Sequence, residues 1–169
     1  VEVTLPASPS RTATIHPAGD AYDVTLSADS NTAFVADGGS GLQIIDVSTP
    51  ASPTLRGNFN TQGNASVVTL SADGNTAFVA DESRGLQIID VSNPASPSLT
   101  VNLDTSGSAY DVALSADGNT AFVADGGSGL QIIDISTLAS PTFTATLGTS
   151  QLARSVTLSA DGNTAIASD

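Results

Sequence analysis

The strongest constraint on the fold is an internal repeat with a constant period of 44 residues. The segment AYDVTLSADSNTAFVAD begins at Ala21 and returns with small changes at Ala65 and Ala109. A partial copy begins at Ala153, and no insertion or deletion separates the copies. In repeat architectures of this period each unit buries its apolar faces only against its neighbours. We therefore expect one stacked structure rather than independent domains.

Each unit contains four segments with the pattern of short β-strands. Residues 22–26 alternate between apolar and polar side chains, which predicts a first strand. The polar turn SADSN or SADGN follows, and a positive φ is expected in it. This turn leads into a second strand at 32–36. Residues 42–47 are almost continuously apolar, which predicts a third strand covered on both faces. Residues 54–59 are more polar and more variable, as an outer edge strand should be.

Four antiparallel strands in a unit of this length predict a blade of a β-propeller, an all-β fold. Blades should pack face to face through an apolar set repeated in every unit: Val24, Leu26, Phe34, Val35, Ile44 and Ile45 with their equivalents. The frame divides the chain into full blades and the two halves of a split blade. The full blades are residues 20–63, 64–107 and 108–151, and the halves are residues 1–19 and 152–169.

The sequence leaves three arrangements of these four blade-equivalents open. The two halves can meet within one chain and close a four-bladed ring, at the low end of the usual range of about 4 to 8 blades. Alternatively, the chain is half of a larger ring that another copy or a longer parent chain completes. In the third arrangement, strands are donated head to tail between chains, which gives rings or open filaments.

Charge and composition exclude several classes of function. The formal net charge is −13 and lysine is absent, so the chain lacks the basic cluster that a nucleic-acid backbone requires. No apolar run approaches the roughly 18 residues of a membrane span. The chain has no cysteine, which excludes thiolate metal sites. It has a single histidine, His16, which excludes sites with paired histidine ligands. We expect His16 to be incidental.

The acidic residues are mostly part of the repeat. Twelve of the seventeen recur at three positions of the unit, and we expect them to cap turns by accepting backbone N–H hydrogen bonds. Calcium binding is the alternative for such carboxylates, although no known calcium-loop spacing is present. The recurring acids are Asp29, Asp73, Asp117 and Asp161; Asp37, Asp81, Asp125 and Asp169; and Glu2, Asp46, Asp90 and Asp134.

Differences between the repeats point to a candidate contact surface. They concentrate at the start of the first strand and in the connection after the second strand, which should lie on one face around the mouth of the propeller channel. Tyrosine and arginine at such positions favour partner contacts. The alternative is that Tyr22 and Tyr110 plug the channel and the other differences are drift. The candidates are Tyr22, Asp23, Glu82, Arg84, Tyr110, Asp111 and Arg154.

The strings LSADGNTAFVAD and GLQIIDVSNPASP resemble the bacterial LVIVD repeat, a relative of the YVTN and tryptophan–aspartate propeller repeats. The resemblance covers essentially the whole chain, and its hydrophobic-Ile-Asp string ends at Asp46, Asp90 and Asp134. It implies a propeller, often in secreted or cell-surface bacterial proteins. It implies no particular reaction, because propellers carry many unrelated functions.

Two classes of function follow as hypotheses. The first is a non-catalytic extracellular or cell-surface module for adhesion, assembly or scaffolding, with a protein, a cell-envelope glycan or a second copy as its partner. The second is a propeller enzyme of the lactonase or lyase type with a divalent metal bound in the channel. A lectin-like sugar binder lies between them, but the chain has no tryptophan and few aromatic rings to stack on sugars.

Overall fold

The structure, a computed structural model, describes residues 11–159 and 164–168, which form fourteen strands in four antiparallel sheets. The first sheet contains β1 (Asp23–Leu26), β2 (Thr32–Ala36), β3 (Leu42–Asp46) and β4 (Thr54–Phe59). The second contains β5 (Val67–Leu70), β6 (Thr76–Ala80), β7 (Leu86–Asp90) and β8 (Ser98–Leu103). The third contains β9 (Asp111–Leu114), β10 (Thr120–Ala124), β11 (Leu130–Asp134) and β12 (Thr142–Leu147). The last pairs β13 (Ser155–Leu158) with β14 (Ala165–Ser168).

Local chemistry explains why these segments become strands. The hairpin between the first and second strands turns at a residue in the left-handed region: Ser30 with φ 59°, Gly74 with φ 72° and Gly118 with φ 71°. The sequence predicted a positive φ at these places, and the structure confirms it. The third strands β3 and β7 have four consecutive buried residues, as a strand covered on both faces requires. The fourth strand is largely exposed in each full sheet, which confirms its edge position.

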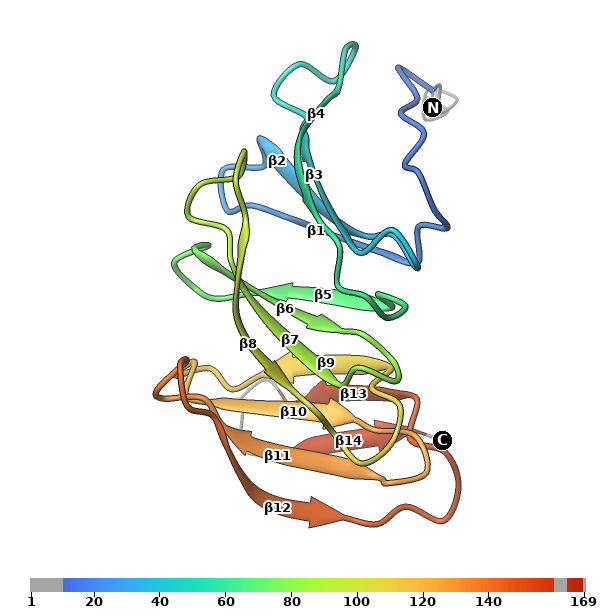
Figure 1. The fold of residues 1–169 in the computed structure, drawn as a ribbon, viewed down its shortest axis with the longest axis vertical. Coiled ribbons are helices and arrows are strands. Elements are labelled where there is room, and N and C mark those ends of the chain that lie inside the picture. Colours follow the sequence, from blue (N-terminus) through green and yellow to red (C-terminus); the bar gives the residue numbers. More distant parts are fainter. Residues whose placement is uncertain (1–10, 160–163, 169) are drawn as a thin grey trace, which may run out of the picture.

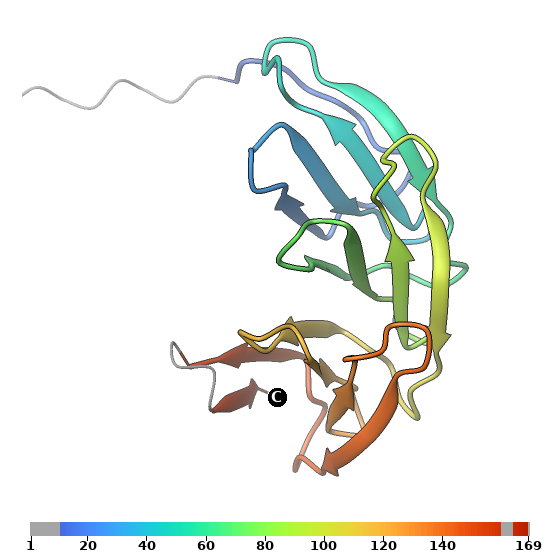
Figure 2. The same ribbon diagram turned by 90° about the vertical axis from the view of Figure 1, so that its left-hand side faces the viewer.

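The four sheets follow one another along the molecule in chain order (Figure 1). The first strands of successive sheets lie side by side in space: β1 beside β5, β5 beside β9, and β9 beside β13. Each sheet therefore contributes its first strand to the inner side of the molecule. Figure 2 shows the sheets fanned around that side as an arc, with the first and last sheets at opposite ends. The predicted all-β propeller of four-stranded antiparallel blades is therefore confirmed. Within the described residues the arc does not close into a ring.

Apolar clusters between neighbouring sheets hold the arc together. One cluster joins Phe34 and Ile44 of the first sheet to Val68 and Val79 of the second. An equivalent cluster joins the second sheet to the third around Phe78, which is 1% exposed. Burying an aromatic side chain of this kind contributes roughly 1.5–3 kcal/mol. A single sheet cannot cover either of its own faces, so the stack is the folding unit.

Two members of the predicted packing set are not buried. The side chains of Val24 and Leu26 on β1 are 59% and 51% exposed, whereas Phe34, Val35, Ile44 and Ile45 are buried. The prediction was wrong for these two because no sheet precedes the first one in the described structure. A strand pattern shows which face is apolar, but it does not show whether a neighbour covers that face.

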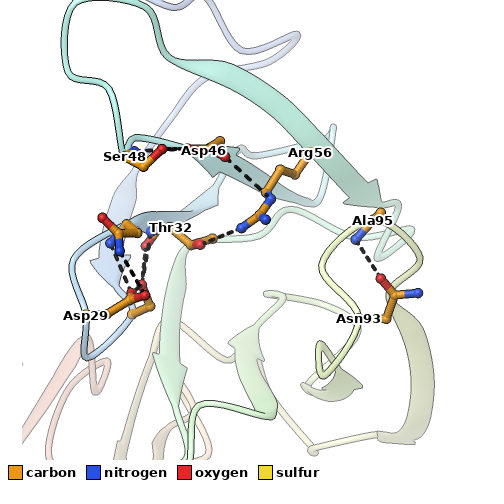
Figure 3. A network of polar contacts seen from close by, with 9 residues as sticks. Asp29, Thr32, Asp46, Ser48, Arg56, Asn93 and Ala95 are labelled. Carbon is orange, nitrogen blue, oxygen red and sulfur yellow. Dashed lines mark hydrogen bonds and ion pairs between the residues drawn. The ribbon is translucent and has the colours of Figure 1, made fainter.

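Exposed carboxylates cap the turns as the sequence predicts. In the first hairpin Asp29 accepts a hydrogen bond from the backbone N–H of Asn31 at 3.0 Å, and Asp46 accepts one from Ser48 at 2.9 Å. Figure 3 shows Arg56 of β4 reaching both Asp46 at 3.7 Å and the Thr32 hydroxyl at 3.1 Å, so this arginine ties three strands together. Hydrogen bonds from serine lower the pKa of both carboxyl groups below the ordinary value of 3.8.

The same caps recur one and two periods further along the chain. Asp73 and Asp117 accept from asparagine N–H groups in their hairpins, and Asp90 and Asp134 accept from serine N–H groups. Among the described residues no three His, Cys, Asp or Glu side chains are gathered so that they could hold a metal ion. The predicted caps at Glu2, Asp161 and Asp169 lie outside the described residues.

The described part of the chain before the first sheet, residues 11–22, has no regular structure. Residues 11–22 form no strand, and His16 is exposed. The assignment of residues 1–19 and 152–169 to one split blade stays a prediction. In the described part of the chain we find no helix long and apolar enough to cross a membrane.

Candidate functional site

The candidate residues lie at one end of their sheets. The start of β1 pairs with the end of β2, with Asp23 opposite Ala36, and the same register recurs at Asp111 and Ala124. Each first-strand start is therefore beside the connection that leads from the second strand to the third. We call this end the mouth surface: Tyr22, Asp23, Glu82, Arg84, Tyr110, Asp111 and Arg154.

Backbone hydrogen bonds join neighbouring sheets at the mouth surface. Gly38 and Ala65 exchange two N–H···O bonds of 3.1 and 3.0 Å, which form a bridge between the first sheet and the second. Glu82 with Ala109 and Gly126 with Ala153 form the same bridge at the next two junctions. The scaffold under the candidate side chains is therefore fixed by backbone pairing and repeats at every junction.

Asp23 and Asp111 support the scaffold. The Asp23 carboxylate accepts a hydrogen bond from the Val68 N–H at 3.0 Å, and the Asp111 carboxylate accepts one from the Val156 N–H at 2.8 Å. Each aspartate thus holds the first strand of the following sheet. At the junction between them, Val67 occupies the equivalent position, and the Thr69 hydroxyl donates to the Val112 carbonyl at 3.0 Å. Sequence reasoning selected these aspartates as contacts and missed their positioning role.

The two tyrosines lie over glycines of the neighbouring connections. An added Cβ at Gly38 or Gly126 would come within 3.2 Å of a ring carbon of Tyr22 or Tyr110, respectively. Both glycines also have a positive φ, of 52° and 53°. The Tyr110 ring is half-buried because Arg154 of the last sheet stacks over it, with 5.2 Å between the guanidinium carbon and the ring centroid. Tyr22 has no such cover and is 59% exposed.

The second sheet replaces the tyrosine–glycine pair with a polar pair. Ser66 takes the tyrosine position, and Glu82 takes the glycine position with a φ of 42°. The Glu82 carboxylate accepts hydrogen bonds from the Asn64 amide at 2.7 Å and from the Ser66 hydroxyl at 3.5 Å. A glutamate in the left-handed region is strained, and strain of this kind clusters at functional positions.

Arg84 is held by a residue that the sequence analysis did not select. Its guanidinium donates to the Gln62 side-chain oxygen at 3.1 Å, and Gln62 itself has a φ of 66°. Gln62 and Asn64 lie in the connection from β4 to β5, whose residues 60–64 also differ from the equivalent segments of the other repeats. That difference between repeats was the signal that could have identified them.

Beneath the mouth surface lies a row of buried aspartates. Asp37, Asp81 and Asp125 are 0% exposed, and the Asp81 carboxylate accepts a hydrogen bond from the Thr61 hydroxyl at 2.6 Å. Thr105 donates in the same way to Asp125 at 2.5 Å. These carboxylates tie the connection between two sheets to the sheet that follows it, so the sequence prediction of simple turn caps was incomplete.

Burial raises the pKa of two carboxyl groups in this row, those of Asp81 and Asp125. It raises the pKa of Asp81 from the ordinary 3.8 to about 6, against the lowering effect of the Thr61 hydrogen bond. Burial also raises the pKa of Asp125. In the first sheet Pro17 stands in the place of the threonine, and Oδ1 of Asp37 has no hydrogen-bond partner.

A surface hollow lies beside the Arg154–Tyr110 pair. It encloses about 480 Å³ and is lined by Gly127, residues 149–152 and Arg154. The lining combines threonine, serine and glutamine side chains with one guanidinium group. This arrangement can recognise a ligand or protein segment that offers carboxylate, hydroxyl or amide oxygens.

Comparison with solved structures supports the propeller architecture. The fold is similar to hydrazine synthase of Kuenenia stuttgartiensis, with a TM-score of 0.76, 20% identity, and coverage of 95% of this chain and 45% of that one. It is also similar to the periplasmic gluconolactonase of Pseudomonas aeruginosa, with a TM-score of 0.72, 17% identity, and coverage of 87% and 46%. The fold is also similar to the β-propeller domain of Swd1 from Myceliophteria thermophila, with a TM-score of 0.65 and 16% identity. That match covers 79% of this chain and 42% of the other one. The chain thus spans slightly less than half the length of each of these proteins.

Sequence comparison identifies the family. A search of curated proteins gave no match. The family described as LVIVD repeat matches three consecutive segments, residues 18–61, 62–105 and 106–149, which together make up most of the chain. These segments carry the three full sheets, and the resemblance found in the sequence is confirmed. The chain belongs to the LVIVD-repeat family.

Proposed function

We propose that this chain is a non-catalytic binding module that acts outside the cell or at its surface, in adhesion, assembly or scaffolding. The mouth surface is its contact site for a protein or a cell-envelope glycan. The scaffold of the mouth repeats in every sheet, whereas its side chains differ, which is how a repeat protein acquires one specific contact.

The Arg154–Tyr110 stack carries this proposal. An arginine over an aromatic ring presents a planar donor group with little remaining side-chain freedom, and both residue types are enriched among residues that dominate binding energy. The stack borders the hollow lined by Thr149 and Gln151, so a partner can insert a polar group beside it. Arg84, fixed by Gln62, offers a second cation on the same end of the sheets.

The test is binding to purified bacterial peptidoglycan by co-sedimentation, together with a glycan array. We expect retention on one of these materials and a loss of about tenfold or more in Arg154→Ala, because arginine anchors of this kind carry much of the affinity. Arg56→Ala is the matched control, because Arg56 lies on the outer strand β4 and pairs with Asp46. Absence of binding to every material would contradict a glycan partner, and equal loss in both variants would contradict the mouth surface as the contact site.

A lactonase-type enzyme with a channel-bound divalent metal is the second candidate. It is favoured by the similarity to a protein described as a periplasmic gluconolactonase, at 17% identity. The measurement is hydrolysis of gluconolactone by the purified chain with and without added Ca²⁺ or Mg²⁺. Turnover of gluconolactone that Arg154→Ala abolishes would favour the enzyme. A hydrolysis rate equal to that in buffer alone would favour the non-catalytic binding module.

A further inference from the structure

One arginine of the first sheet occupies a site formed by two neighbouring strands. Arg56 lies on β4 and reaches across β3 to the Thr32 hydroxyl on β2, to which its Nη1 donates a hydrogen bond of 3.1 Å. Its Nε lies 3.7 Å from Oδ2 of Asp46, the residue opposite Thr32 on β3 (Figure 3). A threonine hydroxyl and a carboxylate on facing strands thus bind one guanidinium group.

The second sheet keeps the threonine and the aspartate but not the arginine. Thr76 and Asp90 lie opposite each other on β6 and β7, one period after the residues that bind Arg56, and Thr100 stands in the place of the arginine. Among the described residues the Thr76 hydroxyl has no hydrogen-bond partner, although Thr76 is 8% exposed. No described cation pairs with the Asp90 carboxylate. A buried hydroxyl without a partner costs free energy, so this place favours a ligand that donates a hydrogen bond.

The Thr76 hydroxyl opens into a hollow between the second and third sheets, and all four strands of both sheets are described. This hollow encloses about 310 Å³, and Thr76 lines it together with Phe78 and Leu138. A hollow of about 320 Å³ lies at the equivalent place between the first and second sheets, where Pro94 stands in the place of Leu138. An apolar wall beside a buried hydroxyl suits a side chain with an aliphatic stem and a polar head.

Charge and geometry indicate which polar head fits the hollow. The chain carries a formal net charge of −13, which favours a cation. Asp73 also lines the hollow, and hydrogen bonds from Ser71 and Asn75 lower the pKa of its carboxyl group. Hydrogen bonds from Ser92 likewise lower the pKa of Asp90, so both groups are charged at neutral pH. A guanidinium group has five N–H donors in a rigid plane and can reach a hydroxyl and a carboxylate at once, whereas an ammonium group is a point charge. Arginine therefore fits better than lysine.

We propose that this hollow binds an arginine side chain of a protein partner, in the way that the first sheet binds Arg56. The guanidinium group donates to the Thr76 hydroxyl and pairs with Asp90, and its methylene groups lie against Leu138. Thr76 begins β6, whereas the mouth surface lies beyond the other end of that strand. The hollow is thus at the opposite end of the sheets and is a second site, beyond the one in the proposed function.

The test uses N-acetyl-arginine amide, which has no charged terminus and so represents an arginine within a protein chain. Binding is followed through the backbone amide signals of the whole chain in two-dimensional NMR spectra. We expect saturable shifts at Thr76 and Asp90 and none at Thr32, whose hydroxyl already accepts from Arg56. N-acetyl-citrulline amide has nearly the same shape without the charge, and it should bind at least about tenfold more weakly.

Three variants locate the site. Thr100→Arg, on the exposed face of the outer strand β8, supplies a guanidinium group from the chain itself and should abolish binding of the arginine probe. Arg56→Thr is the reverse change, and it should let the first sheet bind the probe, with new shifts at Thr32 and Asp46. Arg154→Ala at the mouth surface should bind the probe like the unchanged chain, so a failure of this site and a failure of the proposed function are separate results.

Three results would overturn the proposal. One is the absence of shifts at Thr76 and Asp90 at the highest soluble concentration of the arginine probe. Another is equal binding of the arginine and citrulline probes, which would indicate a site in which charge has no role. The last is undiminished binding of the arginine probe by Thr100→Arg, which would place the probe elsewhere on the chain.

Discussion

Replacing Asp81 by asparagine should change the way in which the stability of the protein depends on pH. Asp81 is completely buried and accepts a hydrogen bond from the Thr61 hydroxyl at 2.6 Å. Its pKa is about 6 in the folded state against 3.8 ordinarily. Because the folded value is the higher one, the folded protein favours the protonated form. The stabilising contribution is fully present below pH 3.8 and is lost as the pH rises through about 6.

The magnitude follows from the two values. The difference between 3.8 and about 6, at roughly 1.36 kcal/mol for each pH unit, is about 3 kcal/mol in the free energy of unfolding. Asparagine has nearly the shape of the protonated acid and does not titrate. The free energy of unfolding of the unchanged protein minus that of Asp81→Asn should therefore fall by about 3 kcal/mol between acidic and neutral pH.

Urea denaturation followed by far-UV circular dichroism, at one pH below 3.8 and one above 6, measures this difference. Asp73→Asn is the control, because hydrogen bonds from Ser71 and Asn75 lower the pKa of the exposed Asp73 carboxyl group. Its contribution is present above pH 3.8 and is lost as the pH falls, so its difference should change in the opposite direction. A pH-independent difference for Asp81→Asn would refute the assignment of a desolvated carboxyl group.

Two further predictions concern backbone conformation. At Glu82, whose φ is 42°, the glycine variant should be more stable than the alanine variant by about 1 kcal/mol. Both variants lose the hydrogen bonds to Asn64 and Ser66, but only alanine keeps the backbone strain of a side chain in the left-handed region. The same two substitutions at the exposed Ser83, outside the left-handed region, should show no such advantage for glycine, and equal behaviour at both sites would contradict the reasoning. Gly85→Ala should destabilise the protein more than Gly74→Ala, for which about 1–2 kcal/mol is expected. The backbone conformation is the same at both sites, with φ of 73° at Gly85 and 72° at Gly74. An added Cβ at Gly85 would meet the Leu103 carbonyl, whereas one at Gly74 would meet nothing within 4 Å. Equal thermal midpoints for these two variants would refute the predicted clash.

The strands could be predicted because their determinants are local. The bounds of β2 at Thr32–Ala36 and of β4 at Thr54–Phe59 agree with the sequence prediction, since turn residues and proline mark both ends of each apolar or alternating segment. The repeat then extended the same assignment to every sheet. The radial stacking followed from the small size of the unit, which cannot cover its own faces.

Features that depend on contacts between units could not be read from one unit. Asp23 looks like a variable surface residue in the sequence. Its carboxylate accepts a hydrogen bond from the N–H of Val68, which belongs to the next repeat, 45 residues away. Asp81 looks like a turn residue, but the connection containing Thr61 folds over it and removes it from water. The exposure of Val24 depends on whether a neighbouring sheet is present, and the alternation along β1 carries no information about that.

The most direct test of the account is to ask whether neighbouring sheets pack face to face in the 44-residue frame. Nuclear Overhauser spectroscopy on methyl-labelled protein reports such contacts between individual side chains. The account predicts cross-peaks from the Phe34 ring to methyl groups of its cluster in the second sheet, Val68 and Val79. It predicts the same pattern one period later, from Phe78 to Val112 and Val123. Cross-peaks confined to residues of the same sheet would contradict the radial packing on which the mouth surface depends.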